Sequence, residues 1–199
     1  EIVFIDLASG KQRLGGSAFA QAFSQLGNEC PDLESSKILK DFFMIIQELN
    51  AKKKIHAYHD RSDGGLFSCL CECAFTSHTG LNINIDDLGD NPLSILFNEE
   101  LGGLIQINKK DKDSIFEIFG RKGIGVYSIA TLSEEYTLKV LHKNNILIET
   151  GIQELHKLWG KMSYEIQKLR DNPDCADSEY NLLGKSDNPG LTSHLTFDI

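Results

Sequence analysis

The sequence predicts an α+β fold, a layered sandwich in which a mixed sheet is flanked by helices. Helix-like and strand-like patterns alternate early in the chain, whereas three strand-like patterns follow one another between residues 125 and 150. A regular parallel α/β wheel would instead need a helix after every strand. With 199 residues, of which 41% are hydrophobic, the chain can bury a core and suits one domain with an extension.

Capping residues and apolar side chains at helical spacing locate the helices. Ser17 can cap a helix that runs to Leu26, with Gly27 closing it. Apolar residues also fall on one face over residues 36–52. The clearest helix runs from Gly151 to Arg170, because apolar residues recur there every three or four positions. Further helices are expected over residues 64–77 and 92–98, and from Asp111 or Asp113 to near Gly123.

Short apolar or alternating runs locate the strands. Leu81, Ile83 and Ile85 alternate with polar residues, as in a half-buried strand. Lys143-Asn144-Asn145 suits a hairpin turn between the last two strands. The other strands are expected over residues 1–8, 55–59, 103–108, 125–132, 136–142 and 145–150.

The pattern changes after Arg170, which divides the chain into a domain over residues 1–170 and a linker over 171–199. Residues 171–190 contain Pro173, Pro189 and several aspartates but little apolar content, so we expect an extended conformation. Leu191 to Ile199 could form a strand cut off from its neighbours.

Composition excludes several classes of partner. The net charge of −9 argues against a broad nucleic-acid surface. No apolar stretch approaches the roughly 20 residues that a membrane helix needs, and no signal peptide is visible. Five cysteines, an odd number, fit reduced thiols better than a disulfide framework. We therefore expect a cytoplasmic protein with neither a nucleic-acid nor a membrane partner.

The segment from Ala57 to Leu66 is the strongest candidate site. An expected strand ends there in carboxylates, and two glycines follow before an expected helix. Glycine lets a backbone approach closely, and free N–H groups at a helix start attract anions. A carboxylate supplies the hard oxygen that Mg²⁺ prefers. We therefore predict a site for a metal-bound phosphate.

Four residues of this segment receive roles in the predicted site. Asp60 is the candidate magnesium ligand, and the hydroxyl of Ser62 could donate to a phosphate or sugar oxygen. Gly64 and Gly65 could bring N–H groups to the phosphate. Structural alternatives stay open: Asp60 could pair with Arg61 or a nearby N–H, Ser62 could be a turn residue, and the glycines could simply form the turn.

Other residues receive a structural interpretation first. Asp63 is better explained as a helix N-cap than as a ligand. Gly15-Gly16-Ser17 could hold a phosphate, but a tight turn with an N-cap explains it equally well. On a helix, only Cys69 and Cys73 of Cys69-Cys71-Cys73 share a face, so buried apolar packing is favoured over a metal site. His59 receives no catalytic role.

Glu99 and Glu100 follow a short apolar segment. One of them could face a neighbouring domain or ligand, but surface charge is the default expectation for both. The sequence does not indicate a Ser-His-Asp or Cys-His constellation, so no catalytic residue is assigned.

Four blocks in order carry a resemblance to a known family. They are Ile5-Asp6-Leu7 with Leu14-Gly15-Gly16-Ser17, the Asp60 segment, Leu96-Phe97-Asn98-Glu99-Glu100-Leu101-Gly102, and Leu169-Arg170-Asp171-Asn172-Pro173. Together they resemble the large, single-chain phosphoribosylformylglycinamidine synthases over nearly the whole chain. The matched region is the second aminoimidazole-ribonucleotide-synthetase-like C-terminal domain and the start of the linker to the glutaminase domain.

The resemblance implies a piece of a longer enzyme, in keeping with a chain that opens at Glu1 rather than at Met. Its partners would be the preceding synthetase-like domains and the following glutaminase domain. Such enzymes use ATP and glutamine to convert formylglycinamide ribonucleotide to formylglycinamidine ribonucleotide in purine biosynthesis. The glutaminase nucleophile would lie beyond Ile199, so the isolated chain should be inactive.

The resemblance also assigns the candidate site. The family position that matches Asp60 is a magnesium ligand, and the one that matches Ser62 contacts the nucleotide. In known members this copy of the site holds a structural nucleotide, ADP or ATP, while turnover occurs at the other copy. Two alternatives stay open: another ATP-using enzyme of the same superfamily, such as aminoimidazole ribonucleotide synthetase or selenophosphate synthetase, or a non-catalytic scaffold domain.

Overall fold

A computed structural model of the chain describes residues 1–27, 29–185 and 196. Within these residues it contains a seven-stranded sheet with the strand order β2-β4-β1-β5-β3-β6-β7. The strands are β1 (Ile2–Asp6), β2 (Ala57–Asp60), β3 (Gly80–Asn84), β4 (Gly102–Gln106), β5 (Gly125–Ser133), β6 (Thr137–His142) and β7 (Asn145–Gly151). The sheet is mixed, because β3 and β6 are parallel while the other neighbours are antiparallel.

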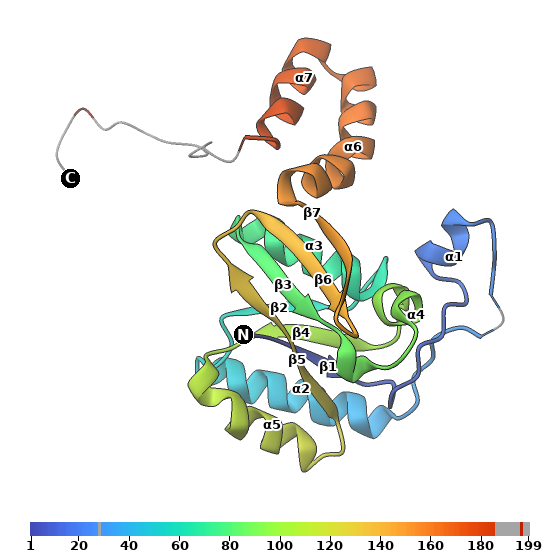
Figure 1. Cartoon of the computed structure of the whole chain (residues 1–199), viewed down its shortest axis with the longest axis vertical. Coiled ribbons are helices and arrows are strands. Elements are labelled where there is room, and N and C mark those ends of the chain that lie inside the picture. Colours follow the sequence, from blue (N-terminus) through green and yellow to red (C-terminus); the bar gives the residue numbers. More distant parts are fainter. Residues whose placement is uncertain (28, 186–195, 197–199) are drawn as a thin grey trace.

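Helices cover the sheet and extend beyond it (Figure 1). They are α1 (Ala18–Ala22), α2 (Ser36–Ala51), α3 (Gly65–Ser77), α4 (Pro92–Phe97), α5 (Lys112–Gly120), α6 (Ile152–Arg170) and α7 (Pro173–Leu182), with 3₁₀ turns η1 (Asp86–Leu88) and η2 (Lys109–Asp111). All the expected strands up to residue 151 form, and the predicted layered α+β sandwich is confirmed.

Two hydrophobic clusters show why β1 is apolar from Ile2 to Ile5. Successive side chains of a strand point to opposite faces of the sheet. Val3 and Ile5 accordingly pack with α2 and α5 on one face, whereas Ile2 and Phe4 pack with α3 and α4 on the other. A central strand covered on both faces therefore reads as a continuous apolar run.

Helix α1 is shorter than the sequence predicts. The Ser17 cap is confirmed, since its Oγ accepts from Ala20 N at 3.2 Å. However, the helix ends at Ala22 rather than Leu26, because Ser24 takes a positive φ of 55° and turns the chain. Gly27 then returns against Gly15, where an added Cβ would lie only 2.7 Å from the Gly15 Cα.

The extended conformation expected for residues 171–190 is wrong over Pro173–Leu182, which form α7. Asn172 caps this helix by accepting from Asp174 N at 2.9 Å, and Pro173 occupies its first turn. The rings of Tyr164 and Tyr180 stack with their centroids 4.1 Å apart. This contact packs α7 against α6. The strand expected at Leu191 to Ile199 lies outside the described residues, apart from Thr196, and the division at residue 170 stays a prediction.

Candidate functional site

The Asp60 segment lies at an edge of the sheet, where β2 passes into α3. Asp60 is the last residue of β2 and pairs with Gly103 of β4. The next residue continues this pairing, because Arg61 N donates to Gly102 O at 2.9 Å. Four residues further on, α3 begins. The predicted order of strand, loop and helix is therefore confirmed.

Asp60 and Arg61 point in different directions and do not pair with each other. Arg61 is buried and donates to the backbone carbonyls of Glu100 and Leu101, the latter at 2.9 Å, while its Nη2 lies 3.5 Å from Asp6 Oδ1. Burial lowers the pKa of Arg61 to about 10, against the opposing effect of the Asp6 charge. The Asp60–Arg61 ion pair, one of the structural alternatives, does not form.

The carboxylate of Asp60 is exposed and accepts a hydrogen bond from the hydroxyl of Tyr58. Burial, together with this hydrogen bond, raises the pKa of Tyr58. Among the described residues, no cation pairs with this carboxylate. Asp60 therefore presents a charged oxygen ligand to its surroundings, as a site for Mg²⁺ requires.

The two glycines make a turn that other residues could not make easily. Gly64 and Gly65 have φ values of 81° and 70°, in the left-handed region. A Cβ on Gly65 would lie 2.7 Å from the carbonyl oxygens of Leu96 and Asn98, so α4 packs directly on its backbone. Gly64 occupies the position before α3 without a side-chain cap, so the expected N-cap role of Asp63 is wrong.

The N–H groups of these glycines are used within the chain. Gly64 N donates to Glu99 Oε1 at 2.8 Å, and Gly65 N donates to Ser62 O at 2.9 Å. The exposed hydroxyl of Ser62 lies 3.4 Å from Asp60 O, a long contact that leaves it able to turn toward a ligand. A phosphate would have to displace Glu99 to reach the N–H of Gly64.

Glu99 joins the two glycine turns of the chain. Its Oε1 accepts from Gly64 N and, at 2.9 Å, from Ala18 N at the start of α1. In the turn before α1, Gly15 N donates to Glu29 O and Gly16 N to Leu26 O, both at 2.7 Å. The geometry of this first turn is therefore that of a tight turn with an N-cap, the structural alternative stated above.

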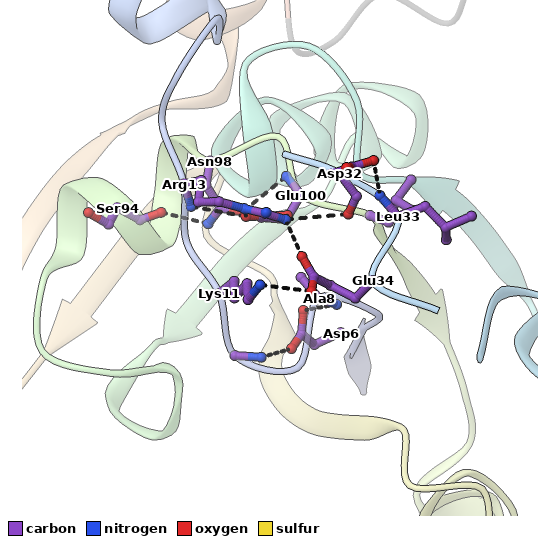
Figure 2. Close-up of polar contacts among 12 residues, drawn as sticks. Asp6, Ala8, Lys11, Arg13, Asp32, Leu33, Glu34, Ser94, Asn98 and Glu100 are labelled. Carbon is purple, nitrogen blue, oxygen red and sulfur yellow. Dashed lines mark hydrogen bonds and ion pairs between the residues drawn. The ribbon is translucent and has the colours of Figure 1, made fainter. Parts of the chain in front are cut away.

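Glu100 forms a buried ion pair, so the expectation of surface charge is wrong for this residue. It is fully buried, and Arg13 donates to it from Nε at 2.6 Å, from Nη2 at 2.8 Å and from its backbone N at 3.1 Å (Figure 2). This hydrogen bonding raises the pKa of Arg13. Glu34 extends the cluster, because its Oε1 lies 2.9 Å from Arg13 Nη2 and its Oε2 lies 2.7 Å from Lys11 Nζ.

On the other face of β2, His59 connects to two residues that sequence reasoning missed. Its Nε2 lies 2.7 Å from Glu72 Oε2, and its Nδ1 lies 2.6 Å from Asp60 O. Trp159 Nε1 donates to the second oxygen of Glu72 at 2.9 Å. Nothing local in the sequence marks these contacts, because Glu72 lies in the middle of α3 and Trp159 in α6.

A groove of about 310 Å³ lies beside this network. Its apolar wall includes Leu81, Leu104 and Leu132 of the sheet, and Glu72 and Trp159 also line it.

No group of three or more His, Cys, Asp or Glu residues within the described part of the chain is placed to hold a metal ion. Asp60 could therefore be only one ligand of a magnesium site. In the cysteine-rich stretch of α3, burial raises the pKa of Cys71 to about 12 and that of Cys73 to about 11, which favours neutral thiols over metal-binding thiolates.

The fold and the glycine-rich strand-to-helix turn define a class of domain. Residues 4–143 match the family described as AIR synthase related protein, C-terminal domain, and the chain belongs to this family. Its resemblance to the phosphoribosylformylglycinamidine synthases is confirmed by the curated enzyme of Schizosaccharomyces pombe, which is 41% identical over 201 residues. That match covers 99% of this chain but only 15% of the relative.

Solved structures agree on the fold. Thermotoga maritima PurL complexed with ATP has a TM-score of 0.62 and 18% identity, over 77% of this chain and 25% of that chain. The same protein complexed with FGAR has a TM-score of 0.61 at 18% identity, over 77% and 27%. Separately, no helix in the described residues is long and apolar enough to cross a membrane.

Proposed function

We propose that this chain is part of a phosphoribosylformylglycinamidine synthase, a ligase of purine biosynthesis. The whole enzyme would use ATP to activate the amide oxygen of formylglycinamide ribonucleotide. Ammonia from glutamine would then displace phosphate and give formylglycinamidine ribonucleotide, ADP, phosphate and glutamate. The identity of 41% along 99% of the chain supports this assignment. Because the chain spans about 15% of that relative, the remaining domains would supply the chemistry.

Within that enzyme, we assign this domain to an auxiliary Mg-nucleotide site. The observation that carries the proposal is the outward-facing carboxylate of Asp60, which ends β2 without a cationic partner among the described residues. Asp60 would hold Mg²⁺, and the exposed hydroxyl of Ser62 would donate to an oxygen of ATP or ADP. Gly64 and Gly65 would shape the loop beneath the phosphates. Complexes of T. maritima PurL with ATP and ADP support a nucleotide as the ligand.

One carboxylate cannot satisfy Mg²⁺, which requires near-octahedral coordination by oxygen. The other ligands would come from the preceding synthetase-like domain of the parent chain and from the nucleotide itself. The following glutaminase domain would supply ammonia. No residue of this chain receives a catalytic role, and its cytoplasmic location stays a prediction.

The decisive experiment compares nucleotide content in the full-length parent protein. Wild type and Asp60→Ala would be purified without added nucleotide and denatured, and the released nucleotide identified. Glu117→Gln is a matched control, because Glu117 is an exposed carboxylate in α5 that pairs with Arg121 one turn away. We expect ADP or ATP from wild type and control and none from Asp60→Ala.

Other outcomes would redirect the proposal. Equal nucleotide content in wild type and Asp60→Ala would remove Asp60 from the site. If no variant released nucleotide, the scaffold alternative would gain support. Asp60→Ala should lower the melting temperature before it alters chemistry, so a variant with wild-type melting temperature and no activity would contradict a structural role for the nucleotide.

A further inference from the structure

We propose that Glu72 is a positioning residue for the Asp60 site, and that it acts through His59 and is itself held by Trp159 of α6. This inference rests on the proposed role of Asp60 as a magnesium ligand. It adds His59, Glu72 and Trp159, which are linked to Asp60 through its backbone carbonyl oxygen.

The carbonyl oxygen of Asp60 is where the network reaches the site. His59 Nδ1 lies 2.6 Å from this oxygen, and Cys69 Sγ donates to it from α3 at 3.0 Å. These contacts fix the plane of the peptide that follows Asp60. Orientation matters here, because β2 has four residues and is paired only with β4 in the described part of the sheet.

Glu72 determines where the His59 ring can lie. Its Oε2 is 2.7 Å from His59 Nε2, so the ring bridges the carboxylate of α3 and the backbone of Asp60. Both ring nitrogens thus lie against oxygen atoms, Nε2 against the Glu72 carboxylate and Nδ1 against the carbonyl of Asp60. Loss of the carboxylate would free the ring to rotate and would release its hold on the Asp60 peptide.

Trp159 completes the network from a distant part of the chain. Its indole Nε1 donates to Glu72 Oε1 at 2.9 Å, although 87 residues separate the two. The two oxygens of Glu72 thus accept from different elements, His59 on β2 and Trp159 on α6. Groups that hydrogen-bond directly to a metal ligand commonly alter metal affinity by about 10- to 100-fold when they are removed, and Glu72 acts one residue further away, so we expect the lower end of this range.

A purely structural role would have a different signature. Helix α3 is already anchored by Leu66, Leu70 and Ala74, which are fully buried. The side chain of Glu72 is 31% exposed, and ion pairs at such positions contribute little to folding stability. Replacing Glu72 should therefore weaken metal binding far more than it lowers the melting temperature of the nucleotide-free protein.

The test measures nucleotide retention by the full-length parent protein as a function of Mg²⁺ concentration. Glu72→Gln keeps the size of the side chain but removes its charge, Trp159→Phe removes the indole donor, and Glu117→Gln is the control. We expect Glu72→Gln to raise the Mg²⁺ concentration for half-retention about tenfold, and Trp159→Phe to raise it less. The control should match wild type.

A second background separates positioning from folding. Because Asp60→Ala is expected to retain no nucleotide, this background reports folding alone, and adding Glu72→Gln to it should leave the melting temperature nearly unchanged. If Glu72→Gln matches the control in Mg²⁺ dependence, the positioning role is overturned while the proposed function stands. The same role is overturned if Glu72→Gln lowers the melting temperature of the nucleotide-free protein in proportion to its loss of binding. If Asp60→Ala retains nucleotide with wild-type Mg²⁺ dependence, the proposed function fails and the positioning role with it.

Discussion

Two carboxylates on either side of one strand pair have opposite surroundings. Asp60 ends β2 opposite Gly103 of β4, and Glu100 lies just before β4. Glu100 is fully buried and receives three hydrogen bonds from Arg13, whereas Asp60 is exposed and receives one from Tyr58. The charge of Glu100 is compensated inside the chain and that of Asp60 is not. The comparison indicates that Glu100 serves the fold and that Asp60 is available to a ligand.

The largest expected effect is the loss of folding stability when the buried Glu100 is replaced. Glu100→Ala would remove a fully buried carboxylate that accepts three hydrogen bonds from Arg13 and would leave Glu34 as the remaining ionic partner of this guanidinium, so we expect a loss of about 3 kcal/mol. We expect chemical denaturation of the 199-residue chain to show a loss of this order. Asp60→Ala in the same chain should be close to neutral. Equal losses for the two variants would abolish the distinction between them.

The next largest loss of stability is expected in the glycine turn that follows Asp60. Gly65→Ala would place a Cβ 2.7 Å from two carbonyl oxygens at a φ of 70°, so we expect a loss of about 2 kcal/mol from backbone strain. Gly120→Ala is a matched control, since an added Cβ there meets nothing within 4 Å. Denaturation midpoints of both variants would be compared with wild type. A neutral Gly65→Ala would mean that α4 can move away from the turn.

The smallest expected effect concerns the binding of Mg-ADP at Asp60. Because Asp60 alone cannot coordinate Mg²⁺ fully, the isolated 199-residue chain should bind Mg-ADP poorly. Calorimetric titration would measure this, with the full-length parent protein as the positive control. Micromolar binding by the isolated chain would show that the missing ligands lie within these residues.

Local patterns predict most of the fold and the strand, loop and helix that carry the candidate site, but not the long-range partners. The glycines and Asp60 could be located because their order along the chain is itself the signal. The ion pair of Arg13 with Glu100 could not, because its members are 87 residues apart and the charged pair Glu99-Glu100 looks like surface. The same separation hides the contact of Trp159 with Glu72.

The order of the strands in the sheet could not be predicted either, because it pairs strands that are far apart in the sequence. The missed helix α7 is a different case. Asn172 and Pro173 are a recognisable helix start, but the polar composition that follows them outweighed this signal in the prediction.

The register of β2 against β4 determines which side chains at the end of β2 point outward. Side chains alternate between the faces of a strand, so a slip of one residue would exchange the surroundings of every side chain. Asp60 would take the inward direction now used by Arg61, and the guanidinium would replace the carboxylate on the outside. A one-residue shift of β2 would thus turn the carboxylate of Asp60 away from its present face, whereas a two-residue shift would keep it on that face.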